Sequence, residues 1–369
     1  MKAIVTGGGT GGHIYPALAV LRALQAKGWG ILYLGSKGGL EGDIIPAEGI
    51  DYQEVNVAPL SRKISFQLIN ATLKTTVGLF QAHKIIKGFQ PNLVLGTGGF
   101  VAGPVVLAAT MLKIPTIIHE QNVYPGFTNR VLARKVDAIA LNFADAEKYF
   151  PRNIKAKYKV TGNPIRKVII NTDKFEGLKK LSLDANKKTL LVFGGSQGSM
   201  SINKAMVDLY HYYKGNPTIQ IIHITGKRNY QMVLKEIEKS GIDIEDYANY
   251  KIMPYLSHME YGYAVADLIV YRAGATGIAE ITSKGLPAIL VPYPHAAENH
   301  QEYNARNLEK HGAAEVILDR DLSGELLIKQ IESIFADEKK LNTMSRNSRK
   351  LGNLEAVENI LQLIEEIIY

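Results

Sequence analysis

A repeated succession of apolar run, glycine-rich turn and helix is the feature of this sequence that most restricts its fold. Residues 2–6 (KAIVT) run into a glycine turn at residues 7–12 (GGGTGG), and the helical spacing of PALAVLRALQAKG follows. Runs of this kind that lack polar alternation are typical of parallel strands covered by helices on both faces. Further runs lie at residues 29–36, 91–99, 114–122 and 136–143. The first part of the chain is therefore predicted to form a Rossmann-like α/β domain.

The same succession begins again after GNPIR, residues 162–166. Residues 188–203 repeat the strand, glycine turn and helix start of the N-terminus, and ADLIVYRAGATGIAEI repeats the pattern of PNLVLGTGGFVAGPVV. A chain of 369 residues is also long enough for two domains. We predict an α/β fold with two doubly wound parallel-sheet domains that face a cleft, residues 1–163 and 164–346. The amphipathic segment at about residues 347–369 is expected to pack back on the first domain.

Positive charge is concentrated in the first half of the chain. The net charge is +8, and residues 1–163 carry twice as many basic as acidic side chains, whereas the remainder is nearly balanced. Between Glu54 and Glu120 there is no carboxylate. This half should attract an anionic surface or substrate, although an uneven charge without such a partner is the alternative.

Composition excludes several classes of function. The chain has no cysteine, which excludes disulfides, thiolate nucleophiles and cysteine zinc sites. No stretch approaches the ~20 apolar residues of a membrane span, and no signal peptide precedes the first strand. A cytoplasmic location is the expectation.

The first glycine turn fits the dinucleotide pattern G-x-G-x-x-G, but the chain lacks the acidic residue that an NAD site places about 20 residues later. The second predicted strand ends at Ser36 and Lys37, and the nearest acid, Glu41, lies beyond a further Gly-Gly. Lys37 would suit NADP, so an NADP oxidoreductase stays open. The turn could equally bind a phosphate of another kind, or be a plain tight turn without a ligand.

Several motifs occur together in a fixed order: GGGTGGH, GTGGFVAGP, HEQN, GNPIR, GGSQGS, RAGATGIAE and ENHQEYNA. In this combination the sequence resembles the MurG family of N-acetylglucosaminyltransferases of peptidoglycan synthesis. The resemblance implies a GT-B fold and an inverting mechanism without a cofactor. It implies UDP-GlcNAc as donor, the undecaprenyl-diphosphate-linked muramyl peptide lipid I as acceptor, and lipid II as product. It also implies a peripheral protein on the cytoplasmic face of an anionic membrane, and no nucleic acid partner.

The resemblance assigns donor-binding roles in the second domain. Ser196 and Arg166 would contact the diphosphate, and Glu280 would accept hydrogen bonds from the ribose hydroxyls. A helix cap, a solvated hinge arginine and a solvated helix glutamate are the respective alternatives. Tyr255 would lie against the uracil. The remaining donor contacts implied by the resemblance are Leu256, Ala275, Thr276 and Gly277 at the uracil, and His300 and Gln301 at the sugar. His300 departs from the paired glutamines that are common in the family.

The first domain is expected to hold the acceptor. The resemblance places the backbone of Thr10, Gly11 and Gly12, and the side chain of Asn122, near the sugar or the acceptor. His13 is the predicted general base, because a helix N-terminus disfavours the imidazolium and keeps the ring neutral at pH 7. A histidine that packs the turn, or one that orients substrate, is the alternative. The rival bases are His119 and Glu120.

Residues 319–321 formally match the D-x-D metal motif of other glycosyltransferases. Acidic residues ahead of LSGELLIKQI more simply start a helix, so no metal site is predicted. Other functions remain open: another lipid glycosyltransferase, a UDP-GlcNAc epimerase, and a non-catalytic nucleotide-sugar binding protein.

Residues 61–89 combine basic and apolar side chains without an acid, which suits an anionic lipid surface. A subset that includes Leu73, Val77 and Phe80 is predicted to be exposed and to insert shallowly. The alternative is that the apolar residues are the core face of a helix. The segment contains the basic residues Arg62, Lys63, Lys74, Lys84 and Lys87, together with Ile64 and Leu68.

Overall fold

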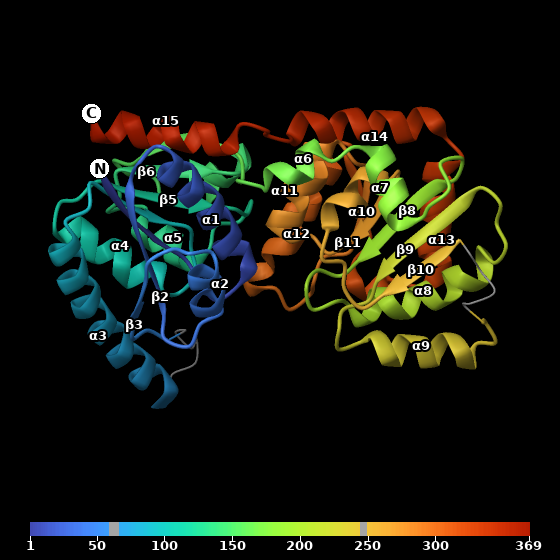
Figure 1. Ribbon diagram of the computed structural model, residues 1–369, viewed down its shortest axis with the longest axis horizontal. Coiled ribbons are helices and arrows are strands. Elements are labelled where there is room, and N and C mark those ends of the chain that lie inside the picture. Colours follow the sequence, from blue (N-terminus) through green and yellow to red (C-terminus); the bar gives the residue numbers. More distant parts are fainter. Residues whose placement is uncertain (59–65, 244–248) are drawn as a thin grey trace. The chain divides into compact units, whose positions relative to one another are not determined.

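The computed structural model describes residues 1–58, 66–243 and 249–369, with the side chains of residues 66–70 left out (Figure 1). Its contacts divide the chain into unit 1, Met1–Ile165 with Glu355–Tyr369, and unit 2, Arg166–Leu354. The division lies slightly after the predicted one at residue 163, because Ile165 still groups with unit 1. None of the helices in the described residues has the length and apolarity to cross a membrane.

The described strands of unit 1 form one parallel sheet in the order β3-β2-β1-β4-β5-β6-β7. Val5 of β1 pairs with Tyr33 of β2 on one side and with Leu95 of β4 on the other. The direction of strand order therefore reverses between β1 and β4, and ligands of such sheets bind beyond the carboxyl ends at this switch point. The strands are β1 Lys2–Thr6, β2 Gly30–Ser36, β3 Tyr52–Val55, β4 Leu93–Gly96, β5 Thr116–Glu120, β6 Ala138–Leu141 and β7 Lys157–Val160.

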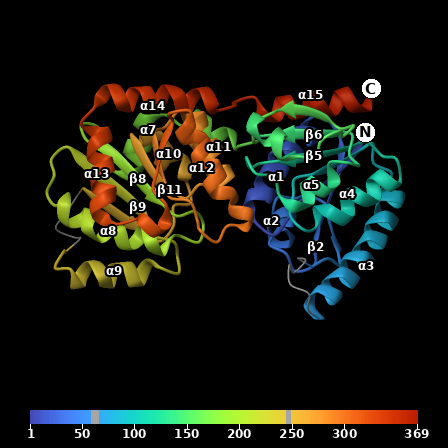
Figure 2. The same ribbon diagram turned by 180° about the vertical axis from the view of Figure 1, so that it is seen from behind.

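Helices cover both faces of this sheet, which explains the uniformly apolar strands. Ala3 and Val5 lie in a core with α1 and α15, whereas Ile4 between them lies in a core with α3 and α4 (Figures 1 and 2). All three side chains are fully buried. The helices of unit 1 are α1 Gly11–Ala26, α2 Glu41–Ala47, α3 Phe66–Phe89, α4 Ala102–Met111, α5 Phe127–Leu132, the 3-10 helix η1 Ala144–Tyr149, and α15 Ala356–Ile368.

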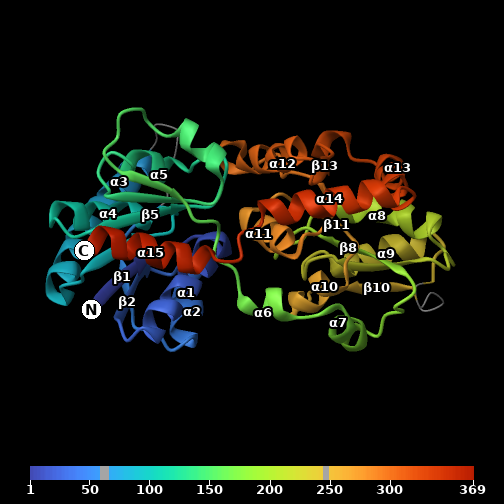
Figure 3. The ribbon, with the colours of Figure 1, turned by 90° about the horizontal axis from the view of Figure 1, so that it is seen from above.

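The C-terminal helix α15 belongs to unit 1 although the chain reaches it from unit 2. Ile360, Leu363 and Ile364 are buried in the core shared with α1, and Figure 3 shows α15 beside α1. On its polar side Glu366 pairs with Lys157 and Lys159, which lowers the pKa of that carboxyl to about 2. The expected helix at residues 347–369 is in fact two helices, because α14 ends at residue 351 in unit 2 and α15 begins at residue 356.

Unit 2 repeats this design with a parallel sheet in the order β10-β9-β8-β11-β12-β13. Leu190 of β8 pairs with Ile221 of β9 and with Leu268 of β11, so the switch point lies between β8 and β11. These three side chains share a core with α8 and α13. The described strands are β8 Lys188–Phe193, β9 Ile219–Ile224, β10 Tyr250–Met253, β11 Leu268–Tyr271, β12 Ala288–Leu290 and β13 Ala314–Val316. The helices are α6 Lys167–Asn171, α7 Lys174–Leu181, α8 Met200–Tyr212, α9 Tyr230–Lys239, α10 Met259–Val265, α11 Ala275–Lys284, η2 Ala297–Asn299, α12 His300–Lys310, η3 Asp319–Asp321, α13 Gly324–Phe335 and α14 Glu338–Leu351.

Candidate active site

The first glycine turn lies at the switch point of unit 1, against the loop that follows β4. The amide of Gly8 donates to the carbonyl of Gly98 over 3.3 Å. Gly99 has a φ of +81°, and a Cβ there would come within 2.2 Å of the Gly8 carbonyl oxygen. Only glycine permits this conformation and this approach. Part of the glycine pattern therefore serves the packing of two backbone loops.

Glu41, at the start of α2, anchors the first glycine turn through a hydrogen bond to its backbone. This fully buried carboxylate accepts hydrogen bonds from the Gly9 amide at 3.2 Å and from the Ser36 amide and hydroxyl at 2.9 and 2.6 Å. Its oxygens are thus occupied by the protein backbone and by Ser36. The one acid that a dinucleotide site could have used for its ribose has another role, which weakens the NADP hypothesis.

His13 is the third residue of α1 and is partly exposed. Its Nδ1 lies 2.9 Å from the carbonyl oxygen of Thr97 and 3.2 Å from Oε1 of Gln121. Burial lowers the pKa of His13, while these hydrogen bonds and the charge of Glu41 act in the opposite direction. A lowered pKa favours the neutral ring at pH 7, and burial is its largest cause.

The two rival bases are engaged by the protein. His119 is buried, its Nε2 donates to the carbonyl of Gly162 over 3.0 Å, and burial lowers its pKa to about 4. Glu120 accepts from the Asn122 amide at 2.9 Å and from Asn129 Nδ2 at 2.8 Å, and burial raises its pKa. This carboxylate anchors the loop after β5, so neither group is available to a substrate hydroxyl.

The other predicted residues of unit 1 follow the carboxyl ends of β1 and β5. Thr10 is the exposed N-cap residue of α1, and Gly11 and Gly12 form the first turn of that helix. Asn122 is half-buried, and its Nδ2 also donates to Glu120. Its position in the HEQN loop is therefore fixed by that carboxylate.

In unit 2 the glycine turn at residues 194–199 follows β8 and leads into α8. Ser199 is the N-cap: its hydroxyl accepts a hydrogen bond from the amide of Ile202 over 3.4 Å. Ser196 is exposed in the turn and is not the cap. Ser196 is therefore not the helix cap that the sequence left open as its alternative role. It is an exposed residue of the turn that leads into α8, and a helix N-terminus is a favourable place for an anion.

Glu280 lies on α11 and is only 9% exposed, so it is not a solvated helix glutamate. The hydroxyl of Tyr263 donates to its Oε2 over 2.8 Å, and Nη2 of Arg166 lies 3.8 Å from its Oε1. Burial raises the pKa of Glu280, and the contacts with Tyr263 and Arg166 partly oppose that rise. Glu280 and Arg166, which the resemblance assigned to the ribose and to the diphosphate, therefore lie next to each other.

The first turn of α11 contains the predicted Ala275, Thr276 and Gly277. Within the described part of the chain, the buried Oγ1 of Thr276 has no hydrogen-bond partner. Gly277 is required for aromatic packing, because a Cβ there would lie 2.5 Å from the ring of Tyr271. Any contact of this glycine with a ligand must therefore come from its backbone.

The segment that follows β10 contains two further predicted residues. Tyr255 is 47% exposed, and Nζ of Lys227 lies 5.0 Å from the centre of its ring. Leu256 is half-buried and packs toward α10, where a Cβ on Gly262 would come within 3.1 Å of it. Tyr255 thus has an accessible aromatic face.

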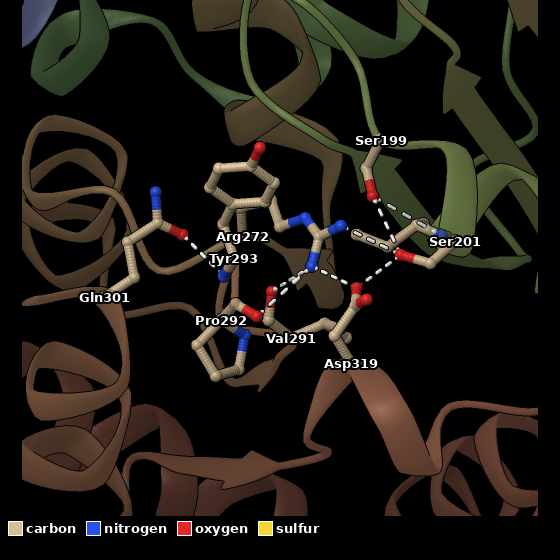
Figure 4. A network of polar contacts seen from close by, with 9 residues as sticks. Ser199, Ser201, Arg272, Val291, Pro292, Tyr293, Gln301 and Asp319 are labelled. Atoms are coloured by element: carbon tan, nitrogen blue, oxygen red, sulfur yellow. Dashed lines mark hydrogen bonds and ion pairs between the residues drawn. The ribbon is translucent and has the colours of Figure 1, made fainter. Parts of the chain in front are cut away.

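The two sugar-contact candidates begin α12. His300 Nδ1 lies 2.7 Å from the carbonyl oxygen of Ala297, so this nitrogen serves the turn. Gln301 accepts a hydrogen bond from the Tyr293 amide through Oε1 at 3.0 Å (Figure 4). The side-chain amide nitrogen of Gln301 points away from that contact in Figure 4.

Arg272, which begins the RAGATG turn, organises the same region and was not singled out from the sequence. Its guanidinium donates to the carbonyls of Val291 and Pro292 at 3.2 Å and to Ser201 Oγ at 2.8 Å (Figure 4). Its fourth partner is the carboxylate of Asp319, at 2.5 Å. One buried cation thus links the loop before Tyr293 to the start of α8.

Asp319 has a different role from the one expected. Residues 319–321 form the separate short helix η3, whereas α13 starts at residue 324 behind its own cap, Ser323. The carboxylate of Asp319 accepts from both Arg272 and Ser201. The acidic motif supports the arginine instead of opening a helix.

Models of two glycosyltransferase domains match this chain. The glycosyltransferase family 28 N-terminal domain matches residues 3–141, and the glycosyltransferase family 28 C-terminal domain matches residues 189–364. The chain belongs to glycosyltransferase family 28. The resemblance, the α/β fold with two parallel-sheet units and the prediction of a glycosyltransferase are confirmed.

Full-length relatives in family 28 are closely similar. A protein of Halothermothrix orenii is 55% identical over 366 residues, covers 99% of both chains, and is named UDP-N-acetylglucosamine-N-acetylmuramyl-(pentapeptide) pyrophosphoryl-undecaprenol N-acetylglucosamine transferase. A protein of Desulforamulus reducens with the same name is 45% identical and covers 100% of this chain and 99% of its own. The crystal structure of Acinetobacter baumannii MurG is 28% identical, covers 99% of both chains and has a TM-score of 0.78.

In this member of family 28, replacing Asp319 with alanine should destabilise unit 2. Arg272 would lose its charged partner, and a hydrogen bond to a charged group contributes about 2 kcal/mol. We expect the midpoint of thermal unfolding to fall by roughly 4–8 °C. Asp321→Ala is the control, because Asp321 is 57% exposed and pairs with the exposed Arg320. Equal midpoints for the two variants in differential scanning calorimetry would contradict the supporting role of Asp319.

Proposed function

We propose that this chain transfers N-acetylglucosamine from UDP-GlcNAc to the 4-hydroxyl of the N-acetylmuramyl pentapeptide on undecaprenyl diphosphate, with inversion at the sugar carbon. The observation that carries the proposal is the 55% identity, over almost the whole length of both chains, to a relative whose name states this donor and this acceptor. The product is lipid II.

The donor belongs to unit 2 in this proposal. Glu280 accepts the ribose hydroxyls, and Arg166 and Ser196 contact the diphosphate. The N-terminus of α8 directs positive partial charge at the β-phosphate as negative charge develops on it. Thr276, Tyr255 and the neighbouring backbone surround the uracil, and Gln301 contacts the sugar. Support comes from the burial of Glu280, its proximity to Arg166 and the exposed position of Ser196.

The acceptor belongs to unit 1, where His13 acts as general base. The acceptor oxygen forms a bond to the sugar carbon, its proton passes to His13, and the bond to UDP breaks with the electron pair staying on the β-phosphate oxygen. A neutral histidine is needed for this step, and the lowered pKa of His13 provides one at pH 7. The engagement of His119 and Glu120 by the protein leaves His13 as the candidate.

The test is incubation with radiolabelled UDP-GlcNAc and a short-chain lipid I analogue, followed by product analysis. We expect one GlcNAc to be added to the analogue for each UDP released. Formation of UDP-ManNAc without transfer would instead favour an epimerase, and binding of UDP-GlcNAc without any turnover would favour a non-catalytic protein.

We further propose that α3 docks the protein on the cytoplasmic face of an anionic membrane. Leu73, Val77 and Phe80 are 62%, 49% and 70% exposed, and their predicted exposure is confirmed. The predicted Arg62, Lys63 and Ile64 lie outside the described residues, and the side chain of Leu68 is among those left out. Other α3 residues such as Ala82 and Ile86 are buried, so the helix has a core face and an exposed apolar face.

Charge reversal on α3 should release the protein from vesicles. Lys74 and Lys84 are exposed, and a basic side chain near an anionic bilayer contributes about 1 kcal/mol. The double variant Lys74→Glu, Lys84→Glu should therefore bind phosphatidylglycerol vesicles at least about 10-fold more weakly. Lys179→Glu, Lys180→Glu on α7 is the control with the same change in net charge. Equal sedimentation of the two double variants with phosphatidylglycerol vesicles would contradict docking through α3. So would binding of the unmodified chain to phosphatidylcholine vesicles that is as tight as its binding to phosphatidylglycerol vesicles.

A further inference from the structure

A line of hydrogen bonds runs from His13 through buried side chains to the loop that follows β7. Gln121 Oε1 lies 3.2 Å from His13 Nδ1, and Gln121 Nε2 lies 3.1 Å from His119 Nδ1. His119 Nε2 then lies 3.0 Å from the carbonyl oxygen of Gly162. Gln121 and His119 are each 1% exposed. No role was assigned to Gln121 from the sequence, although it lies inside the HEQN motif.

Two backbone carbonyls fix the direction of every hydrogen bond in this line. A carbonyl oxygen only accepts, so His119 must carry its proton on Nε2, which faces Gly162. Because a neutral imidazole has one N–H, His119 Nδ1 is then an acceptor. The second carbonyl, that of Thr97, lies 2.9 Å from His13 Nδ1 and requires a proton on that nitrogen.

The amide of Gln121 fits between the two rings in one orientation. Its nitrogen must face His119 Nδ1, which accepts, and the same nitrogen also donates to the Thr97 carbonyl over 2.7 Å. Its oxygen must therefore face His13, where it accepts from Nδ1–H. With the amide turned over, the oxygen would meet the lone pairs of both the Thr97 carbonyl and His119. Only one assignment of the proton positions therefore satisfies all of these hydrogen bonds.

These proton positions leave Nε2 as the basic nitrogen of His13. With the proton on Nδ1, the lone pair of neutral His13 is on Nε2, and no described residue hydrogen-bonds to that atom. The loop after β4 lies against the ring: a Cβ on Gly98 would come within 2.8 Å of Nδ1 and 2.9 Å of Cε1.

We propose that Gln121, itself oriented by His119, is a positioning residue that holds His13 as the Nδ1–H tautomer with Nε2 ready to accept a proton. As Nε2 takes the proton of the acceptor hydroxyl, Nδ1–H remains bonded to the Thr97 carbonyl and to Gln121, which share the developing positive charge. The catalytic part of this inference rests on the proposed function, whereas the tautomer belongs to the protein without substrate.

The tautomer is measured by two-bond 1H–15N correlation NMR on the full chain labelled with 15N-histidine, with His13→Gln used to assign the His13 signals. We expect His13 as Nδ1–H and His119 as Nε2–H. The opposite tautomer of His13 overturns the proposal, whatever the enzyme does. If both histidines show the expected tautomers but the protein does not transfer GlcNAc, the proposed function is overturned instead.

Gln121→Met tests the positioning role, because methionine has a similar length without the amide. We expect the second His13 tautomer to appear and kcat to fall at least about 10-fold, part of the ~10² to 10⁴-fold that a positioned base contributes. The KM for UDP-GlcNAc and the calorimetric Kd for UDP should stay unchanged. Gln53→Met, at an exposed position of β3, is the matched control. An unchanged tautomer together with an unchanged kcat in Gln121→Met would overturn the positioning role. If this variant does not fold, the wild-type tautomer still decides the proposal.

Discussion

Replacing His13 with alanine should lower the turnover number about 100-fold or more while the affinity for UDP stays close to that of the unmodified chain. A positioned general base contributes about 10² to 10⁴ to the rate. His13 belongs to unit 1, and the residues assigned to UDP belong to unit 2. The loss should therefore appear in kcat and not in the Kd that isothermal titration calorimetry gives for UDP.

The pH dependence gives an independent check on His13. The base must be neutral, and burial places its pKa below the ordinary value of 6.5, with Glu41 of α2 and His119 of β5 as the titratable neighbours. We expect kcat to be constant around pH 7 and to fall as the pH is lowered through this depressed pKa. The acid limb should disappear in the alanine variant. Near-normal turnover of that variant would return His13 to a structural role.

Glu280→Ala should weaken UDP binding at least about 10-fold. Each hydrogen bond from a ribose hydroxyl to a charged carboxylate contributes about 1.5–3 kcal/mol, and about 1.4 kcal/mol corresponds to a factor of 10 in Kd. Glu280→Gln keeps the shape and an accepting oxygen but removes the charge, so we expect an intermediate Kd. Glu325→Ala, at an exposed position of α13, controls for the loss of one negative charge in unit 2.

The affinity for UDP should also depend on pH through Glu280. Burial raises its pKa, and the groups that face it are Tyr263, Arg166 and Glu260. The ionised carboxylate is the form that accepts both ribose hydroxyls. Affinity should therefore fall as the pH is lowered, and the fall should begin above the pH at which an ordinary glutamate titrates. A Kd for Glu280→Ala within a factor of two of wild type, measured by calorimetry, would remove the ribose assignment.

The parts of the fold that sequence predicted best are those with a local signal. The strands β1, β8 and β11 are followed directly by glycine turns and helices, and uniform apolar runs mark them without any long-range information. The strands β12 and β13 are three residues long and offer no period to detect. The break between α14 and α15 was missed because both segments are amphipathic, and the close approach of Gly352 to the carbonyl of Thr282 is not visible in a local pattern.

The residues of the candidate site also divide into those with a local sequence signal and those whose roles depend on long-range contacts. His13 was chosen because it follows a glycine turn at a helix start, and Glu280 was chosen through the resemblance to the MurG family. Gln121 contacts His13 across 108 residues of sequence, and Asp319 contacts Arg272 across 47. Their roles depend on which loops the sheet order brings together, which residue spacing does not reveal. Asp319 carried a visible signal, the D-x-D match, but its partner could not be identified from the sequence.

The placement of α15 has a consequence for biosynthesis. Unit 1 is assembled from both ends of the chain, and Ile360, Leu363 and Ile364 from the last residues are buried in its core. A ribosome releases the N-terminal residues first, and domains generally fold as soon as they emerge. Here residues 166–354 are synthesised before the missing helix of unit 1, so the uninterrupted unit 2 can finish folding first. The domain that is begun first on the ribosome is completed last, and until then its apolar face for α15 remains uncovered.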